Sequence, residues 1–249
     1  MRKKLIVANW KMHGTRATSA ALLNALSAQS IPSAVDVVVC APFVFVPMCQ
    51  ATLSGSGIAW GAQNISEHMQ GAYTGEISAA MLADFACAYV LVGHSERRAL
   101  YGENDALVAA KLQQALSAGI RPILCVGETE AEHEAQQTEA VIARQINAAL
   151  DTLDDAESTC VIVAYEPVWA IGSGKTATPA QAQAAHAFIR ALWSRRSQTQ
   201  AEALIVLYGG SVKADNARLL FAQPDVDGGL VGGAALDAGQ FSAIINAAQ

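Results

Sequence analysis

The chain has 249 residues, of which 52% are apolar and 15% are charged, and its net charge is −6. These values allow a large hydrophobic core and exclude an intrinsically disordered chain. The acidic balance and the lack of a basic run argue against nucleic acid or an anionic membrane surface as a partner. The apolar run at residues 5–8 is shorter than the roughly 7–15 residues of a signal-peptide core, and no stretch approaches the roughly 18 apolar residues of a membrane span.

Eight short apolar runs rich in β-branched residues recur along the chain. They lie at residues 5–8, 35–40, 58–61, 89–92, 122–126, 160–164, 203–207 and 226–231. The runs are continuous rather than alternating, which is typical of parallel strands buried on both faces. Segments rich in Ala, Leu and Gln separate them and predict helices. Eight β-then-α units in about 250 residues are typical of a single (β/α)8 barrel, and no linker divides residues 1–249, so we expect one domain.

Two of the predicted helices begin with capping sequences. Thr129 is followed by Glu132, and Thr178 is followed by Pro179 and then Gln181, which are typical N-terminal patterns. In the helix predicted after Thr129, one face is apolar and the opposite face is rich in Glu and Gln. The apolar face consists of Val141, Ile142, Ile146, Ala149 and Leu150.

An open, doubly wound sheet is the alternative architecture. Such a sheet usually has a Gly-x-Gly-x-x-Gly turn after its first strand. Here the first run is followed by residues 9–14, NWKMHG, which lack that pattern. The barrel is therefore favoured.

The five cysteines are odd in number and include no Cys-x-x-Cys pair. Three of them, Cys40, Cys125 and Cys160, lie inside apolar runs. This usage favours buried, reduced thiols over disulfides or a metal site, and we expect a cytoplasmic location. The histidines outside the candidate site lack a second ligand at metal spacing, so no metal site is expected; they are His13, His68, His133 and His186.

One long connection, residues 63–77, has no clear secondary-structure pattern. Loops of that length in compact domains are usually functional or form an interface. A plain surface loop is the alternative.

Polar residues follow five of the apolar runs, at the point where each predicted strand ends. In a barrel these positions converge on one face, where active sites lie. They are Asn9 and Lys11 after the first run, His94 after the fourth, Glu166 after the sixth, Gly209-Gly210-Ser211 after the seventh and Gly232-Gly233 after the eighth.

Several of these positions also have simpler interpretations. Lys11 is equally consistent with a solvated cation after a strand. His94 is also consistent with a helix start at which Ser95 is the N-cap and Glu96 interacts with the helix dipole.

The two glycine pairs point to an anion. Barrels often bind phosphate at the loops after strands seven and eight, and glycine lets the backbone approach the anion without a Cβ in the way. A phosphate site with a carboxylate, an imidazole and a lysine suggests proton transfer next to the carbonyl of a phosphorylated small molecule.

Residues 164–176, AYEPVWAIGSGKT, combine an acid with an apolar, glycine-containing loop. Pro167 biases Glu166 towards an extended backbone. The next stretch is too apolar for a solvated loop and too rich in glycine for a stable helix. We interpret it as a lid over a catalytic acid; a structural carboxylate beside an ordinary loop is the alternative.

The motifs at the strand ends resemble those of the triosephosphate isomerase family. The similar segments run in the family's order and span the chain: residues 9–11 (NWK), 93–98 (GHSERR), 164–172 (AYEPVWAIG), 208–211 (YGGS) and 228–233 (GGLVGG). The resemblance implies a barrel enzyme that interconverts dihydroxyacetone phosphate and D-glyceraldehyde 3-phosphate without a cofactor.

The resemblance also implies a role for each matching residue. Glu166 would transfer the carbon-bound proton, neutral His94 would polarise the carbonyl, and Lys11 would stabilise the enediolate. Asn9 would bond a substrate oxygen, and Glu96 would orient its neighbours. The phosphate would be held by the amides of Gly172, Ser211, Gly232 and Gly233.

The family is usually homodimeric. The resemblance implies that the loop around Thr74 enters the partner subunit beside its Asn9 and Lys11. Two positions depart from the family pattern: Ser173 stands where threonine is common, and Ala235 where serine is common. Each departure affects lid closure or phosphate affinity rather than the assignment.

The alternatives are another phosphate-binding barrel, such as a sugar-phosphate isomerase or an aldolase, and a barrel that has lost catalysis. A barrel aldolase would need a Schiff-base lysine in a late strand, and runs six to eight contain none. A binding or scaffold protein that had lost catalysis would be expected to lack Lys11, His94 or Glu166, and all three are present.

Overall fold

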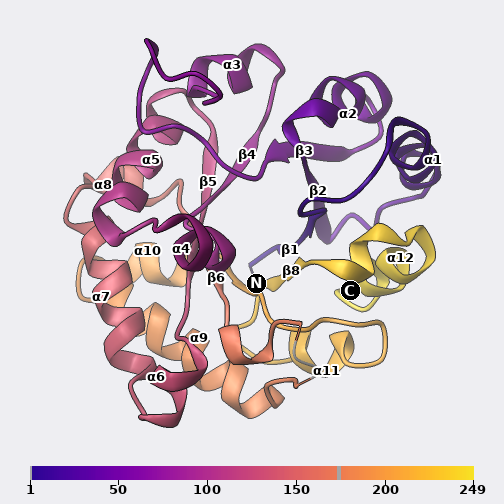
Figure 1. The fold of residues 1–249 in the computed structure, drawn as a ribbon. Helices are drawn as coiled ribbons and strands as arrows, with labels where there is room; N and C mark the ends of the chain where they lie inside the picture. The colour runs from indigo at the N-terminus through magenta and orange to yellow at the C-terminus, as the bar shows by residue number, and fades with distance from the viewer. Residues whose placement is uncertain (1, 173–174) are drawn as a thin grey trace.

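The computed structural model describes residues 2–172 and 175–249. Within them, the strands form one closed parallel barrel in which each strand pairs with its neighbours in the sequence and the last pairs with the first (Figure 1). The strands are β1 (Lys4–Asn9), β2 (Val35–Ala41), β3 (Ile58–Ala62), β4 (Tyr89–Val92), β5 (Arg121–Val126), β6 (Ile162–Tyr165), β7 (Val206–Tyr208) and β8 (Gly228–Val231). The expected single-domain (β/α)8 barrel is confirmed.

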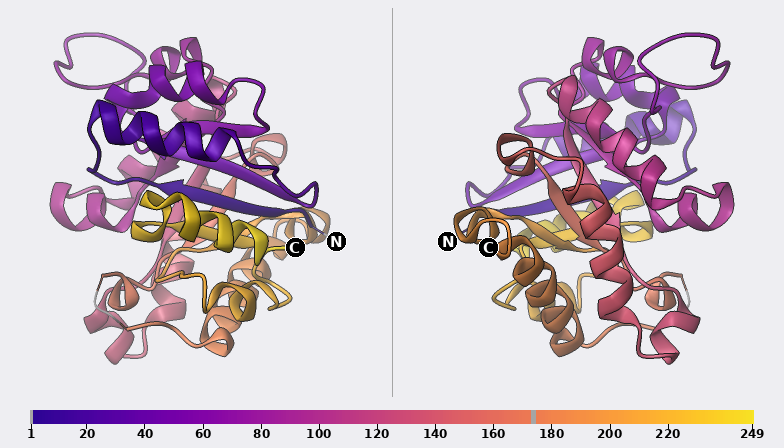
Figure 2. Two further views of the ribbon diagram at one scale, coloured as in Figure 1. Left: turned by 90° about the vertical axis from the view of Figure 1, so that its right-hand side faces the viewer. Right: turned by 90° about the vertical axis from the view of Figure 1, so that its left-hand side faces the viewer.

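Helices surround the barrel on its outside (Figures 1 and 2). The longer ones are α1 (Arg16–Ser27), α2 (Val46–Leu53), α5 (Asp105–Ser117), α7 (Thr138–Leu150), α9 (Pro179–Ser194) and α12 (Ala238–Asn246). The shorter ones are α3 (Ala79–Asp84), α4 (Ser95–Tyr101), α6 (Glu130–Glu134), α8 (Asp155–Ser158), α10 (Gln198–Ala203) and α11 (Ala217–Phe221), with the 3-10 turns η1 (Phe43–Phe45), η2 (Val168–Ala170) and η3 (Gly233–Leu236). None of the described helices is both long and apolar enough to cross a membrane.

Alternate residues of each strand belong to two separate parts of the core. In β1, Leu5 and Val7 pack in a cluster at the centre of the barrel, whereas Ile6 and Ala8 belong to the layer between the strands and the helices. Both strand faces are therefore buried. This is why the apolar runs are continuous rather than alternating.

The bounds of three predicted strands are wrong at their first residues. Cys160 lies before β6 in a turn, where its N–H donates to Glu157 O at 3.0 Å, and it is exposed, so the expected burial of this thiol is also wrong. Ala203 is the last residue of α10, and Val226 precedes β8. Before β6 and β7 the apolar composition continues back into the preceding turn and helix, whereas Asp227 separates Val226 from β8.

The helix predicted after Thr129 is in fact two helices. Both predicted capping boxes are confirmed, at Thr129 for α6 and at Thr178 for α9. However, α6 ends after one turn, and Gln136 has a φ of 57°, which interrupts the helix before α7 begins. The five predicted apolar residues are buried on one face of α7, as expected.

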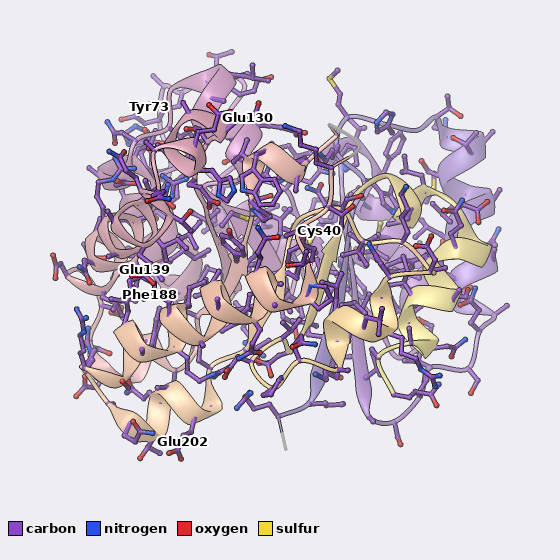
Figure 3. The ribbon with its side chains drawn as sticks, turned by 90° about the horizontal axis from the view of Figure 1, so that it is seen from below. Cys40, Tyr73, Glu130, Glu139, Phe188 and Glu202 are labelled. Carbon is purple, nitrogen blue, oxygen red and sulfur yellow. The ribbon has the colours of Figure 1, made fainter. Side chains whose placement is uncertain are left out.

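The long connection at residues 63–77, every one of them described, contains no helix or strand. It stands out from the rest of the molecule between β3 and α3 (Figure 2). Figure 3 shows Tyr73 of this loop at the edge of the molecule, in contrast to Cys40 of β2 near its centre. The loop packs partly on itself, since the rings of His68 and Tyr73 stack with their centroids 3.6 Å apart.

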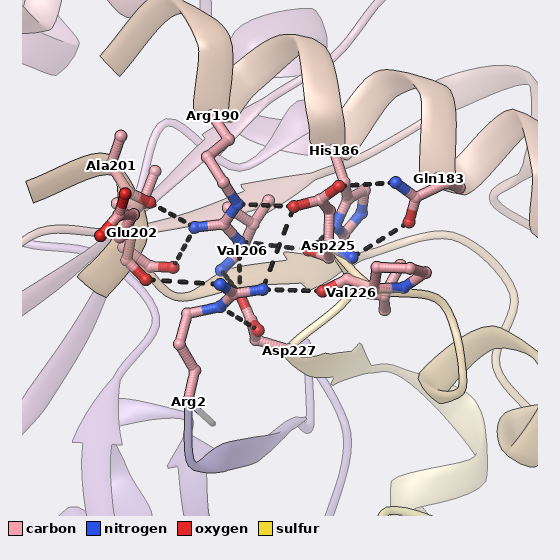
Figure 4. Close-up of polar contacts among 12 residues, drawn as sticks. Arg2, Gln183, His186, Arg190, Ala201, Glu202, Val206, Asp225, Val226 and Asp227 are labelled. Atoms are coloured by element: carbon pink, nitrogen blue, oxygen red, sulfur yellow. Dashed lines mark hydrogen bonds and ion pairs between the residues drawn. The ribbon is translucent and has the colours of Figure 1, made fainter. Parts of the chain in front are cut away.

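A network of ion pairs connects the ends of the barrel strands opposite the candidate site (Figure 4). Asp227 is buried just before β8. Its carboxylate accepts from Arg2 Nε at 2.7 Å, Arg190 at 2.9 Å and the Val206 N–H at 3.0 Å. Arg190 also bonds Asp225 at 2.7 Å. These bonds connect the first, seventh and eighth strands with helix α9.

Candidate active site

The candidate residues surround one cavity of about 320 Å³ at the carboxyl ends of the strands. Every residue expected to act on or bind the substrate lines it: Asn9, Lys11, His94, Glu166, Gly172, Ser211, Gly232 and Gly233. They come from five strand ends and the lid. The closed barrel brings them together although they are far apart in the sequence.

Glu166 is buried, with 2% of its surface exposed, directly after β6. Its backbone N–H donates to Val126 O at 2.7 Å, which fixes the strand end. One carboxylate oxygen lies 2.9 Å from His94 Nε2, and the other accepts the Ser95 N–H at 2.8 Å. Burial raises the pKa of Glu166, but His94, the Ser95 N–H and the charge of Lys11 lower it, and the net pKa lies below the ordinary value. The carboxyl is therefore ionised at neutral pH.

His94 is itself the N-cap of α4, so the interpretation of Ser95 as the cap is wrong. The imidazole Nδ1 accepts the Glu96 N–H at 3.2 Å. Because Nδ1 accepts this bond, the proton of the neutral ring lies on Nε2, which faces Glu166.

The protonation of His94 is under opposing influences. Burial lowers the pKa of His94, whereas the charge of Glu166, the hydrogen bond to it and the charge of Glu96 raise it, and the net pKa in this structure lies above the ordinary value. The start of α4 favours the neutral ring. It does so through the Glu96 N–H, but the adjacent carboxylate acts in the opposite direction.

Lys11 is paired with an acid rather than solvated. Its Nζ lies 2.5 Å from Glu96 Oε1. Its backbone has a φ of 51°, in the left-handed region, and its N–H donates to Asn9 Oδ1 at 3.0 Å. Glu96 therefore contacts Lys11 with its side chain and His94 with its backbone, which agrees with an orienting role.

The glycine segments also line the cavity. Gly209 has a steric requirement that the sequence did not indicate: an added Cβ would lie 2.8 Å from Glu166 Cγ and 3.1 Å from Tyr165 O. At Gly232 an added Cβ would lie 3.3 Å from Lys11 Cε, which places the ammonium chain beside this segment. Nothing lies within 4 Å of a Cβ at Gly233, the first residue of η3, so its backbone is open.

The lid begins immediately after Glu166. Pro167 precedes η2, and Gly172, with a φ of 68°, ends the part of the lid that the structure describes on this side. Ser173 and Gly174 lie outside the described residues, so the effect of serine in place of threonine has no structural account. Ala235, the other departure, is buried in η3, where its N–H donates to Gly232 O at 2.8 Å.

Glu128 is a buried acid that the sequence analysis did not identify. It accepts from Trp169 Nε1 at 2.8 Å and from the Tyr165 hydroxyl at 3.0 Å, and its carbonyl accepts the Val168 N–H at 3.1 Å. Glu128 thus anchors the first turn of the lid. It follows the fifth strand, so the rule that found the other residues would have found it too.

Two further polar residues near the site were also missed. Lys213 lines the cavity beside Ser211. Gln63 follows β3 and donates to Lys11 O at 2.9 Å. Among residues 2–172 and 175–249, no group of three or more His, Cys, Asp and Glu side chains could hold a metal ion.

Comparison with known proteins decides the family. A sequence model of the triosephosphate isomerase family matches residues 4–248. This chain belongs to the triosephosphate isomerase family. A triosephosphate isomerase from Thiobacillus denitrificans is 58% identical over 248 residues, which cover 100% of this chain and 99% of that relative. One from Cupriavidus pinatubonensis is 55% identical over 247 residues, covering 99% and 100%, and one from Nitrosococcus oceani is 52% identical over 249 residues, covering 100% of each.

Membership of the triosephosphate isomerase family confirms the resemblance noted in the sequence. The chain is an aldose–ketose isomerase that interconverts dihydroxyacetone phosphate and D-glyceraldehyde 3-phosphate, a reaction of glycolysis and gluconeogenesis. The alternatives of an aldolase and of a non-catalytic barrel are thereby set aside.

Proposed function

We propose that Glu166 is the base of this isomerase and that His94 and Lys11 are its electrophilic partners. An ionised carboxylate in contact with an imidazole, with an ammonium at the same cavity, is the observation that carries the proposal. Glu166 removes the proton from the carbon next to the substrate carbonyl and returns it to the neighbouring carbon. The product is the isomeric triose phosphate, and the intermediate is an enediolate.

His94 donates from Nε2 to the carbonyl oxygen as negative charge develops there. The bond from the Glu96 N–H to Nδ1 supports this role, because it leaves Nε2 as the position of the ring proton. In this structure that proton faces Glu166. Substrate binding must therefore replace the His94–Glu166 contact with one bond from His94 to the substrate and one from Glu166 towards the reacting carbon.

Lys11 stabilises the enediolate electrostatically, and Asn9 bonds a substrate oxygen. The phosphate is bound by backbone amides of Gly172, Ser211, Gly232 and Gly233. The proximity of the Lys11 chain to Gly232 supports one continuous site in which the ammonium lies between the reacting atoms and the phosphate. No cofactor enters this scheme, since both proton transfers use side chains of the chain itself.

We also propose that the enzyme acts as a homodimer through residues 63–77. A second cavity of about 160 Å³ lies on the other side of Lys11 and is lined in part by Gln63, Glu96 and Tyr101. Met12 beside it is 94% exposed, and Tyr101 is 68% exposed. The loop around Thr74 of a second copy, which stands out from its own barrel, would cover these apolar side chains and this cavity.

A cytoplasmic location completes the proposal. It is supported by the free thiols, four of which are buried, and by the place of the reaction in glycolysis. The net charge of −6 gives no support for a nucleic acid or an anionic membrane as a partner.

The experiment that tests the assignment of the base measures Glu166→Gln. Dihydroxyacetone phosphate is added, and glyceraldehyde 3-phosphate is followed through a coupled dehydrogenase. We expect turnover to fall by at least about 10²–10⁴-fold, or about 3–5 kcal/mol of barrier, because an amide cannot accept the carbon-bound proton. Circular dichroism and thermal unfolding control for the fold. Turnover close to that of the parent would show that Glu166 is not the base.

A further inference from the structure

Lys11 has a backbone conformation that a lysine does not adopt on its own. Its φ of 51° lies in the left-handed region, and the other non-glycine residues with positive φ in the described part of the chain are Ala86 and Gln136. A Cβ disfavours this conformation, so it persists only where the surroundings hold it. Both peptide groups at Lys11 are held by amide side chains.

Gln63 holds the carbonyl of Lys11. Its Nε2 donates to Lys11 O at 2.9 Å and to Cys40 O at 3.0 Å. Cys40 belongs to β2 and is fully buried, so its carbonyl is a fixed point of the barrel wall. One amide nitrogen thus connects Lys11 to a strand. Asn9 completes the arrangement by accepting the Lys11 N–H at 3.0 Å.

Gln63 is itself fixed through its neighbour. Lys111 Nζ, nearly fully buried, donates to Asn64 Oδ1 at 2.9 Å and pairs with the buried carboxylate of Glu103. Asn64 therefore attaches the chain to helix α5 immediately after Gln63 attaches it to Lys11 and β2. The protruding loop at residues 63–77 starts from a segment that is anchored on two sides.

We propose that Gln63 is a positioning residue for the isomerase reaction. By holding Lys11 in the left-handed conformation, it directs the side chain to the wall of the substrate cavity, where the chain lies beside Gly232, while the ammonium pairs with Glu96 at 2.5 Å. Without the Gln63 bond, the Lys11 backbone relaxes towards the right-handed region and the side chain turns away from the substrate. This inference rests on the proposed role of Lys11 in stabilising the enediolate.

A double-mutant cycle separates this role from simple stabilisation of the fold. The cycle compares Gln63→Met, Lys11→Met and the double variant; methionine has a similar length to glutamine and no N–H donor. Gln63→Glu serves as a second variant that keeps the shape but removes the donors. The matched control is Gln183→Ala, since Gln183 is another glutamine that makes two hydrogen bonds, both to Asp225 on the opposite face of the barrel.

We expect Gln63→Met to lower kcat/KM by about 10- to 100-fold, as a displaced catalytic group does. In the Lys11→Met background the same change should alter kcat/KM by less than about twofold, because residues that act through one another are not additive. Gln183→Ala should lower the melting temperature and leave kcat/KM unchanged. Gln63→Glu should behave as Gln63→Met does.

Two results would overturn the inference. One is an equal loss in both backgrounds, which would mean that Gln63 supports the fold and not Lys11. The other is a loss that disappears as enzyme concentration rises, which would trace the effect to subunit dissociation. A different result, near-normal kcat/KM of Lys11→Met alone, would contradict the proposed role of Lys11 itself.

Discussion

Glu166 and His94 each change the proton affinity of the other. The acid has a lowered pKa and the imidazole a raised one, since each favours the charged form of its partner. A second proton on His94 would have to enter at Nδ1 and displace the Glu96 N–H. The backbone at the start of α4 therefore opposes the imidazolium that Glu166 favours. In the proposed reaction, Glu166 turns to the substrate, which would remove the main influence that raises the pKa of His94.

His186, which lies away from the site, also has a pKa that its surroundings change. Its ring is fully buried in α9, Nδ1 lies 3.2 Å from Asp225 O, and Nε2 has no hydrogen-bond partner among the described residues. Burial lowers the pKa of His186 to about 4, from the ordinary value of about 6.5. The unfolded chain thus takes up a proton at a higher pH than the folded protein does.

We predict a loss of stability in acid that depends on His186. The contribution of this residue is fully present above pH 6.5 and is lost as the pH falls towards 4. Between pH 7.5 and 4.5 the loss is about 2.5 kcal/mol of unfolding free energy. Denaturant unfolding of the parent and of His186→Gln at both pH values, at one protein concentration, measures it. An equal pH dependence in the two proteins would contradict the prediction.

At the scale of an element, β6 and the lid act as one unit. Glu166 directly follows β6, and Pro167 leads from it into η2. Glu128, which follows β5, holds η2 through hydrogen bonds from Trp169 Nε1 and the Val168 N–H. Trp169 also stacks on His133 of α6, with ring centroids 4.4 Å apart. The first part of the lid is thus fixed to the neighbouring strand and helix.

Deleting residues 171–174 should change the products. Without the lid backbone that binds the phosphate, the enediolate leaves the site and loses phosphate in water, which gives methylglyoxal. We expect methylglyoxal per turnover to increase while isomerisation falls. The two products are quantified together, with the spontaneous decomposition of substrate subtracted. If the shortened enzyme formed no more methylglyoxal per turnover than the parent, the lid would not be what protects the intermediate.

At the scale of the whole molecule, the exposed apolar residues lie mostly on one side. Met69 and Tyr73 belong to the protruding loop, and Met12 and Tyr101 lie around the cavity that would receive it. Leu219 on α11 is also exposed, but α11 lies on the opposite side of the barrel from that loop (Figure 1). Tyr73 on the loop and Leu219 on the opposite side are therefore a matched pair of positions at which to test the proposed dimer.

Sedimentation at micromolar concentration should show a dimer for the parent. Tyr73→Glu should shift it to monomer, because the interface would bury an unpaired carboxylate; we expect Kd to rise by at least about 100-fold, or about 2.7 kcal/mol. Leu219→Glu introduces the same charge elsewhere and should leave the dimer intact. A parent that is monomeric throughout, or equal dissociation of both variants, would rule out the proposed interface.

The barrel was predictable because its strands are buried on both faces, so that each appears as a continuous apolar run. The bounds were less predictable, since Cys160 and Val226 are as apolar as the strands they precede. The same rule of reading strand ends gathered Asn9, Lys11, His94 and Glu166 at one cavity. Gln63 after the third strand and Glu128 after the fifth strand also fit this rule, but they were not among the predicted site residues.

Other features of the site could not come from the sequence. His94 caps α4 in place of Ser95 through a local bond, since its Nδ1 accepts the N–H two residues on. That Gly209 must lack a Cβ because Glu166 Cγ is adjacent depends instead on a contact between distant segments. The left-handed backbone of Lys11 is likewise a product of its surroundings. The pattern of residues within one segment contains no information about contacts with other segments.

The bond from Arg2 to Asp227 spans 225 positions of the chain, and it has a consequence for biosynthesis. β1 can pair with β2 as soon as both have left the ribosome, but its other edge pairs with β8, which is made after the other seven strands. Until then that edge carries unpaired backbone groups, which can join to other chains. The nascent polypeptide therefore cannot close its barrel before all eight strands have been made, and in this interval aggregation competes with folding.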